Sequence, residues 1–229
     1  RRRSASREKD MAIPVTWKLP ASPPPAKRAD ARRNRKRILA AAREQFAEHG
    51  VDVHMERIAR AAGVGVGTVY RHFPAKKDLL QALADERFAV FAETARGCLR
   101  DADPWRGFCE LMRECGRITA TDRALSEAMD QFPELCAASA EKVRLQELTG
   151  QLIDRAKASG AMGAEFTTDD IPSLMRGLAR ATATRPSGPP AISWQRYLDI
   201  MLAGLRAGAP DVTQTETTAP PAPRSPGTS

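Results

Sequence analysis

Residues 55–73 read MERIARAAGVGVGTVYRHF, and this stretch predicts two short helices joined by a tight turn. The apolar residues of the first helix recur at helical spacing and give it one buried face: Met55, Ile58, Ala59 and Ala62. Gly63 ends that helix, because glycine adopts a positive φ without steric cost.

A second helix is expected over residues 65–72, with Val69 turned inward. Four other side chains of this helix are expected to lie partly outward: Val66, Thr68, Tyr70 and Arg71. Hydroxyls, an arginine and a small apolar group suit the phosphates and the thymine methyls of a DNA major groove. The stretch therefore predicts a helix-turn-helix that binds DNA.

The glycine-rich segment GVGVG at residues 63–67 has an alternative interpretation as a loop that cradles the phosphates of a nucleotide. No predicted strand precedes it, and no lysine follows its last glycine. Its spacing fits neither common nucleotide motif. The sequence therefore favours DNA binding over nucleotide binding.

Gly50, the Ile58-Ala59 pair and the segment AGVGVGTVYRHFPAK at residues 62–76 resemble the DNA-binding signature of the TetR family of transcriptional regulators. The resemblance is strong over about residues 33–83, and beyond them it is one of architecture and length. It implies three N-terminal helices that bind DNA, followed by a helical domain that binds an effector and dimerises.

The resemblance also implies roles for individual side chains. Thr68 and Tyr70 are expected to bond phosphates or base edges, and Val66 to lie near base methyls. His72 is expected to bond a phosphate, as is Lys76 at the start of the fourth helix.

Arg71 either reads a guanine or holds the DNA backbone, and the sequence does not choose between the two. The chain departs from the family pattern at Gly65, where a serine is common, and before Met55, where a threonine or serine usually caps the helix. His54 stands there instead, so Asp52 is the expected cap and no phosphate-binding hydroxyl is carried over.

The formal net charge of +8 and the pI near 9.7 are consistent with a polyanionic partner but do not establish one. Residues 27–37 hold seven basic side chains against one acidic side chain. A solvated helix start is the alternative interpretation, but the run lies just ahead of the helix-turn-helix. We therefore expect Arg32 and Arg33 to bind phosphates, each adding about 0.9 to the salt dependence of binding.

The whole chain predicts an all-α fold of about nine helices, because no segment has a convincing strand pattern. Long helices are expected over residues 30–49, 75–99 and 133–159. The predicted organisation has four parts: a disordered arm at 1–26, the helix-turn-helix domain at 27–74, an effector-binding and dimerisation domain at 75–208, and a disordered tail at 209–229.

Catalysis and metal binding are disfavoured by the spacing of the polar residues. His49, His54 and His72 all fall in the DNA-binding part, without the pairing of a helix-built metal site. The four cysteines form no C-x-x-C pair, and no apolar run reaches the length of a membrane span. We expect a cytoplasmic protein with reduced thiols, which is not an enzyme and has no cofactor.

Bulky, soft side chains stand out in an otherwise alanine-rich C-terminal part: Trp105, Phe108, Met112, Cys115, Phe132 and Met175. Core packing accounts for any one of them. The resemblance implies an effector cavity among these helices, and such cavities are mostly apolar. These six residues are therefore the predicted site for a small, largely apolar organic effector.

The last two predicted helices have apolar faces around Leu178 and Leu205. These faces either fill the core of the subunit or, as the resemblance implies, pair with their copies in a homodimer. A two-fold dimer predicts a palindromic operator of about 15–20 base pairs. The resemblance implies a regulator, expected to be a repressor, that its effector releases from this operator. A C-terminal domain without a cavity favours the rival interpretation, an architectural DNA-binding protein without an effector.

Overall fold

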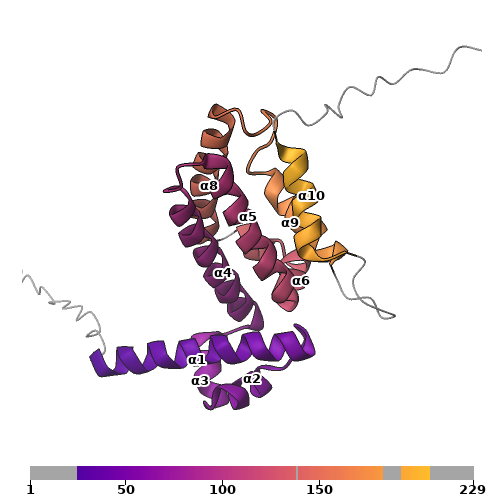
Figure 1. The fold of residues 1–229 in the computed structure, drawn as a ribbon. Helices are drawn as coiled ribbons and strands as arrows, with labels where there is room; N and C mark the ends of the chain where they lie inside the picture. The colour runs from indigo at the N-terminus through magenta and orange to yellow at the C-terminus, as the bar shows by residue number, and fades with distance from the viewer. Residues whose placement is uncertain (1–24, 138, 183–191, 207–229) are drawn as a thin grey trace, which may run out of the picture.

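The computed structural model describes residues 25–137, 139–182 and 192–206, and these ranges form ten helices and no strand (Figure 1). The helices are α1 (Pro25–His49), α2 (Met55–Ala62), α3 (Val66–His72), α4 (Lys76–Cys98), α5 (Pro104–Thr121), α6 (Arg123–Gln131), α7 (Glu134–Ala137), α8 (Ala140–Ala158), α9 (Asp170–Ala181) and α10 (Trp194–Leu205). The predicted all-α fold is confirmed. The predicted tail and most of the predicted arm lie outside the described residues.

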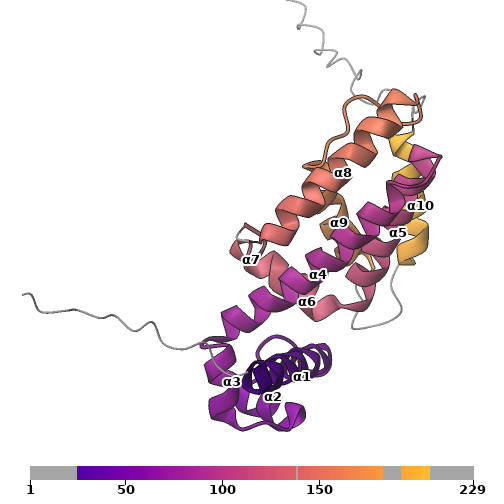
Figure 2. The ribbon, with the colours of Figure 1, turned by 90° about the vertical axis from the view of Figure 1, so that its left-hand side faces the viewer.

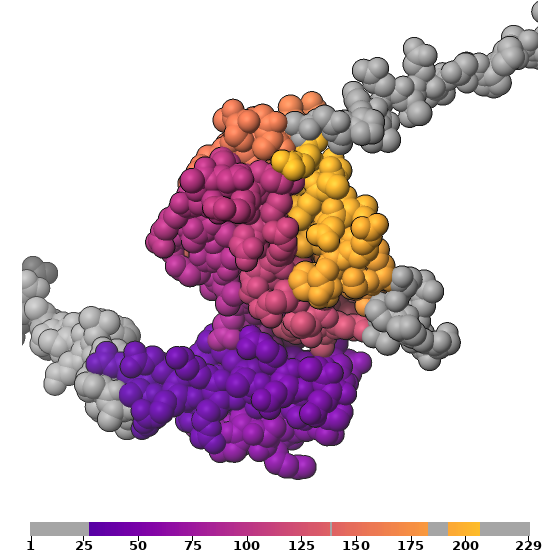
Figure 3. All heavy atoms as spheres, in the orientation of Figure 1, coloured from indigo at the N-terminus to yellow at the C-terminus, as the bar shows by residue number. Residues whose placement is uncertain are grey.

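Helices α1–α3 form a layer at one end of the molecule, and α4 rises from this layer into the bundle formed by the remaining helices (Figures 1 and 2). Within the bundle α5 is central: it contacts α4 and α8 as well as α9 and α10. The space-filling view shows the α1–α3 layer as a slab beneath the bundle (Figure 3). Among the helices that the structure describes, none combines the length and the apolar composition of a membrane span.

The turn between α2 and α3 is formed as the sequence predicts. Gly63 has φ of 62°, and its N–H donates to the Arg60 carbonyl. The next N–H, that of Val64, donates to the Ala59 carbonyl at 3.1 Å. Helices commonly end at a glycine with left-handed backbone, where the following N–H groups donate to carbonyls of the last turn. Here this helix end sets the direction in which the chain runs from α2 into α3.

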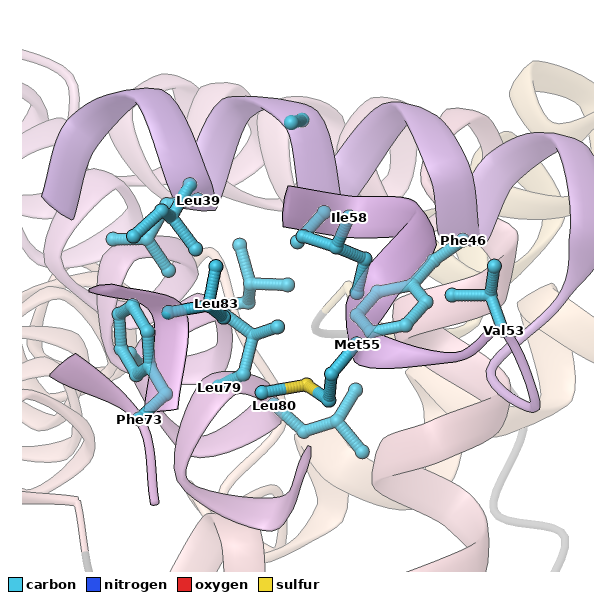
Figure 4. Packing of buried hydrophobic residues seen from close by; sticks show 14 of the residues in the cluster. Leu39, Phe46, Val53, Met55, Ile58, Phe73, Leu79, Leu80 and Leu83 are labelled. Atoms are coloured by element: carbon cyan, nitrogen blue, oxygen red, sulfur yellow. The ribbon is translucent and has the colours of Figure 1, made fainter. Parts of the chain in front are cut away.

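Apolar side chains from α1–α3 and from the first turns of α4 meet in one buried cluster (Figure 4). The figure labels nine of its members: Leu39, Phe46, Val53, Met55, Ile58, Phe73, Leu79, Leu80 and Leu83. The cluster continues into the bundle through Leu125 of α6 and Leu135 of α7. The core of the DNA-binding layer is therefore shared with the helices above it.

A second cluster of apolar side chains lies among α4, α5, α8, α9 and α10, and Phe108, Leu152 and Leu178 are fully buried members of it. Helix α4 contributes to both clusters, with Leu79 and Leu83 in the first and Phe88 and Phe91 in the second. It is therefore the element through which the two parts of the molecule are joined.

Some boundaries differ from those expected. The segment predicted as one helix over 133–159 is divided into α7 and α8, because Ser139 has an extended backbone and its hydroxyl accepts the N–H of Lys142 as a helix cap. The described residues thus hold ten helices rather than about nine. Helix α1 begins at Pro25, so the last two residues of the predicted arm are helical. The predicted cap Asp52 is wrong, since His54 occupies that position and α2 begins without a side-chain cap.

Candidate DNA-binding surface and effector cavity

Helix α3 has one buried and one exposed face. Val69 is fully buried beneath it, whereas Val66, Tyr70 and Arg71 are exposed, with 43% of the tyrosine surface accessible. Thr68 and His72 are half-buried. This confirms the predicted orientation of Val69 and leaves the side of α3 away from the core covered with groups that can contact DNA.

Two arginines of α1 contact the segments that flank α3, the turn before it and the residue that follows it. The Arg37 guanidinium donates to the Gly63 carbonyl at 3.1 Å, and the Arg35 guanidinium lies 5.4 Å from the centre of the Phe73 ring. A cation over an aromatic face is attracted by the ring quadrupole. These members of the basic run therefore help to position α3.

Arg32 and Arg33 are exposed on the N-terminal part of α1, which projects past α2 and α3 (Figure 1). Arg33 forms an ion pair with Asp30 on the same helix. Exposed pairs of this kind contribute little to stability. Both arginines are thus placed where a DNA backbone can reach them.

Lys76 lies at the first residue of α4 and is half-buried. Its ammonium donates to the Val51 carbonyl at 3.0 Å and so holds the loop between α1 and α2. A lysine ammonium has three donors, so this contact leaves capacity for a phosphate. The sequence did not predict the contact with Val51, because it depends on how two distant segments pack.

A cavity of about 630 Å³ opens between α4, α5, α6, α8 and α9, and Cys136 of α7 also lines it. Of the six residues predicted to bind an effector, Met112, Cys115 and Met175 line it. Further apolar walls come from Phe88, Phe91, Leu111, Met129, Leu145 and Ile171. A concave, mainly apolar space with a few polar groups is typical of a small-molecule site.

The other three predicted residues lie elsewhere. Phe108 is fully buried and packs between Trp105 and Phe166, with ring centres 5.9 and 5.8 Å away. Trp105 is half-buried beneath the Arg206 guanidinium. Phe132 follows α6 and leaves 40% of its surface exposed. None of the three is among the residues that line the cavity.

Arg87 of α4 is the most buried charged residue of the lining, and it was not predicted from the sequence. It lines the cavity, is only 6% exposed, and pairs with the Asp122 carboxylate at 3.0 Å. It also donates to the Asp122 carbonyl at 2.8 Å and to the Ser126 hydroxyl at 3.0 Å. Its spacing from Ala84 and Phe91 places it on the buried face of α4, which is the signal that could have found it.

Burial lowers the pKa of the Arg87 guanidinium, and the attraction of Asp122 acts in the opposite direction. The group stays protonated near neutral pH, since arginine does not lose its proton in proteins. Its Nε is buried and has no hydrogen-bond partner among the described residues. Buried donors normally find a partner, so this atom is unusual.

Asp122, the residue between α5 and α6, also connects the cavity to the DNA-binding layer. Its carboxylate lies 3.8 Å from the Arg43 side chain of α1. Arg43 in turn pairs with Glu86 of α4 at 3.3 Å. A short chain of charged groups therefore runs from Arg87 in the cavity to α1.

The cysteines are free thiols without the surroundings of reactive groups. Burial raises the pKa of Cys115 to about 12 and also raises the pKa of Cys98, Cys109 and Cys136. A thiol with a raised pKa is a poor nucleophile and metal ligand near neutral pH. The part of the chain that the structure describes holds no group of three side chains suited to a metal ion.

The faces of α9 and α10 divide between the subunit core and solvent. Leu178 is fully buried, close to Gly116 of α5, and Leu205 is half-buried. Leu178 is therefore a core residue, which corrects its expected place on a dimer surface. Ile200 of α10 is 53% exposed, and the space where a Cβ of Gly204 would lie is open.

Comparisons with known proteins agree with this geometry. The chain matches a family model for bacterial regulatory proteins of the tetR family over residues 38–83, and one for the C-terminal domain of SbtR-like transcriptional regulators over residues 103–207. It is 34% identical over 134 residues to the HTH-type transcriptional repressor KstR of Mycobacterium tuberculosis. That match covers 56% of this chain and 60% of the repressor, which is less than two thirds of the repressor's length.

Two solved structures are similar over most of their length. The TetR transcription regulatory protein of Mycobacterium vanbaalenii is 32% identical, with a TM-score of 0.55, and the match covers 79% of this chain and 99% of that one. The TetR transcriptional regulator SCO0520 of Streptomyces coelicolor is 30% identical, with the same TM-score, and the match covers 76% of this chain and 99% of that one.

Proposed function

This chain belongs to the TetR family of transcriptional regulators, and on that premise we propose that it represses transcription by binding an operator as a homodimer. A small organic effector in the cavity releases the DNA. The name of the similar M. tuberculosis protein, a repressor, supports this direction of control.

The observation that carries the proposal is the division of α3 into two faces. Val69 fixes the helix to the core, while Val66, Tyr70 and Arg71 are exposed together on a surface that no other described element covers. In a helix-turn-helix, the second helix enters the major groove with such a face. Tyr70, Thr68, His72 and Lys76 then bind phosphates or base edges, and Arg32 and Arg33 extend the contact along the backbone.

Dimerisation supplies the second recognition helix. The side of the bundle formed by α10 is uncovered along much of its length (Figure 3) and presents Ile200 next to the open approach at Gly204. An isologous pairing of this surface with its copy buries that isoleucine. Leu205, half-buried in one subunit, can complete the contact.

The dimer surface is tested by Ile200→Glu, with Leu178→Glu for comparison. Since Ile200 is exposed, its glutamate variant retains the helical circular dichroism of the native chain but sediments as a monomer and loses operator affinity. Leu178→Glu buries a charge and unfolds the subunit. An Ile200→Glu chain that remains dimeric would exclude this surface.

The cavity is the proposed effector site. Its apolar walls suit a largely apolar molecule. Such a ligand weakens DNA binding only if it binds the DNA-free arrangement of the protein more tightly than the DNA-bound arrangement. The presence of a cavity disfavours the rival interpretation of an architectural DNA-binding protein.

The proposed function is tested by selecting bound duplexes from a random DNA library with the full chain. We expect one enriched sequence with two inverted half-sites whose centres lie about 10 base pairs apart. Repeating the selection with Arg71→Ala determines whether that arginine reads a base or holds the backbone. A selection that enriches no sequence over the input would overturn the proposal.

A further inference from the structure

The charges that line the cavity are unbalanced. Five of the lining side chains are basic, and two are acidic. The basic residues are Arg87, Arg123, Lys142, Arg176 and Arg180. The two acidic residues are already engaged: Asp130 lies 2.7 Å from Arg180 and 3.9 Å from Arg176, and Glu127 lies 3.7 Å from Arg123. An anionic ligand therefore fits this cavity better than a cationic one.

Arg87 is the most buried of the five, and it has an unused donor. Its two terminal nitrogens are occupied by Asp122, Ser126 and the Met129 sulfur, whereas Nε has no partner among the described residues. A guanidinium binds a carboxylate through two parallel N–H groups, one of which is commonly Nε. Nε itself is buried in the unliganded structure, so a ligand carboxylate that displaces Asp122 and turns this edge of the guanidinium toward the cavity satisfies the orphan donor.

We propose that the cavity binds an amphiphilic organic molecule whose carboxylate binds Arg87 and competes with Asp122 for that guanidinium, while the apolar part lies against Phe88, Met112 and Leu145. The assignment rests on the proposed function of the cavity as an effector site. It adds the chemical class of the effector and the side chain that selects it.

The competition reaches the DNA-binding layer through Asp122. The carboxylate of Asp122 lies between Arg87 at 3.0 Å and Arg43 of α1 at 3.8 Å. When a ligand takes over the charge of Arg87, Asp122 loses the partner that holds it against α4. Its contact with Arg43 then changes as well, which alters how α1 is held against α4 and α6. This route requires no movement through the apolar core.

Calorimetric titration of the full chain with decanoate, decan-1-ol and decylamine tests the ligand class, because the three probes share an alkyl chain and differ in headgroup. Decanoate is expected to bind about tenfold or more tightly than decan-1-ol, which corresponds to a charge-assisted hydrogen bond. Decylamine is expected to bind most weakly. Equal affinity for decanoate and decan-1-ol would overturn the proposal.

Two variants assign this preference to one side chain. Arg87→Gln is expected to lower the affinity for decanoate to that for decan-1-ol, whereas Lys142→Gln, which removes another cation of the lining, keeps the preference. If Lys142→Gln removes the preference and Arg87→Gln keeps it, the carboxylate binds Lys142, which contradicts the assignment of Arg87.

Asp122→Asn tests the competition and does not depend on whether Arg87→Gln folds. Removing the competing charge is expected to raise the affinity for decanoate several-fold and to leave that for decan-1-ol unchanged. A misfolded chain cannot produce such a gain. An unchanged or lower affinity for decanoate would contradict the competition between the two carboxylates.

The transmission to α1 is tested on the selected operator. Decanoate is expected to weaken DNA binding by the native chain and to have less effect on Arg43→Gln. The Arg43 side chain is exposed, so this replacement is expected to preserve the fold. An equal response in both chains would exclude this route. If an operator is selected but decanoate and decan-1-ol bind equally, the proposed ligand class is wrong and the proposed function stands. If no operator is selected but decanoate binds through Arg87, the ligand class is right and the proposed function is wrong.

Discussion

Around α1–α3 the apolar side chains fill the space between the helices, whereas between α4, α5, α6, α8 and α9 the bundle leaves a cavity of about 630 Å³. Both regions use leucine, methionine and phenylalanine, so residue type alone does not separate them. The first holds α3 in one orientation toward DNA. The second retains empty volume and a buried cation, which a domain selected only for stability would not keep.

The largest expected difference is in the free energy of unfolding, and it is measured on one fully buried leucine from each region. Leu79 is fully buried in the DNA-binding core, and Leu111 is equally buried but borders the cavity. We expect Leu79→Ala to lower the free energy of unfolding by about 3–5 kcal/mol, toward the upper part of the range for such changes. Leu111→Ala is expected to cost about 2 kcal/mol, because a side chain next to empty space has fewer partner atoms to lose.

Urea unfolding followed by circular dichroism measures both values. Similar losses for the two variants would mean that the cavity is closed in solution and that the two cores are packed alike.

Two buried methionines allow the opposite test, in which a larger side chain is introduced into each region. Met55 is buried in the DNA-binding core, and Met112 is buried against the cavity. Met55→Trp is expected to overpack its site and cost about 1–3 kcal/mol. Met112→Trp can turn its larger ring into the cavity, so we expect a cost below about 1 kcal/mol together with loss of decanoate binding.

Thermal unfolding and calorimetric titration measure these two effects. A Met112→Trp chain that still binds decanoate with native affinity would show that the ligand lies elsewhere.

The thiols give a smaller effect that locates the ligand. Cys136 is half-buried and lines the cavity, whereas Cys109 lies in the second core away from it. Burial raises the pKa of Cys136, and since only the thiolate reacts, alkylation by iodoacetamide is expected to accelerate as the pH rises from 7 to 9. Decanoate is expected to slow the alkylation of Cys136 several-fold without changing that of Cys109.

Mass spectrometry of the alkylated chain distinguishes the two sites, and Cys136→Ser serves as the control. Equal protection of Cys109 would indicate a general stabilisation of the fold in place of a ligand in the cavity.

The smallest expected effect concerns the first turn of α3. Gly65 is the N-cap residue, with an extended backbone and room for a side chain. Serine is preferred over glycine at this position by a few tenths of a kcal/mol. Gly65→Ser is expected to raise stability by about that amount and, because the hydroxyl is exposed beside Thr68, to increase DNA affinity. A measured loss of stability would mean that the cap geometry requires glycine.

The difference between the two regions also explains which features could be predicted from sequence. Met55, Ile58, Gly63 and Val69 are separated by a few residues, so local helical periodicity and one glycine conformation determine their positions. The all-α fold and the helix-turn-helix followed from such patterns. Contacts within one turn or between adjacent helices are set by spacing that can be read directly.

The cavity could not be predicted in this way. Met112, Cys115 and Met175 line it while Phe108 does not, and this depends on how helices from distant parts of the chain pack together. Helical spacing places Arg87 on the buried face of α4, but its pairing with Asp122, 35 residues away, could not be predicted because it depends on tertiary packing. The division into α7 and α8 was not predicted, because the capping bond of the Ser139 hydroxyl interrupts a sequence pattern that reads as one continuous helix.

The most direct test of the central claim, that α3 reads the major groove, is dimethyl sulfate footprinting of the selected operator bound by the full chain. This reagent methylates guanine N7 in the major groove and adenine N3 in the minor groove. The account predicts protection of guanine N7 in two clusters about 10 base pairs apart, with adenine N3 still reactive between them. Protection confined to adenine N3 would place the protein in the minor groove and contradict the role of α3.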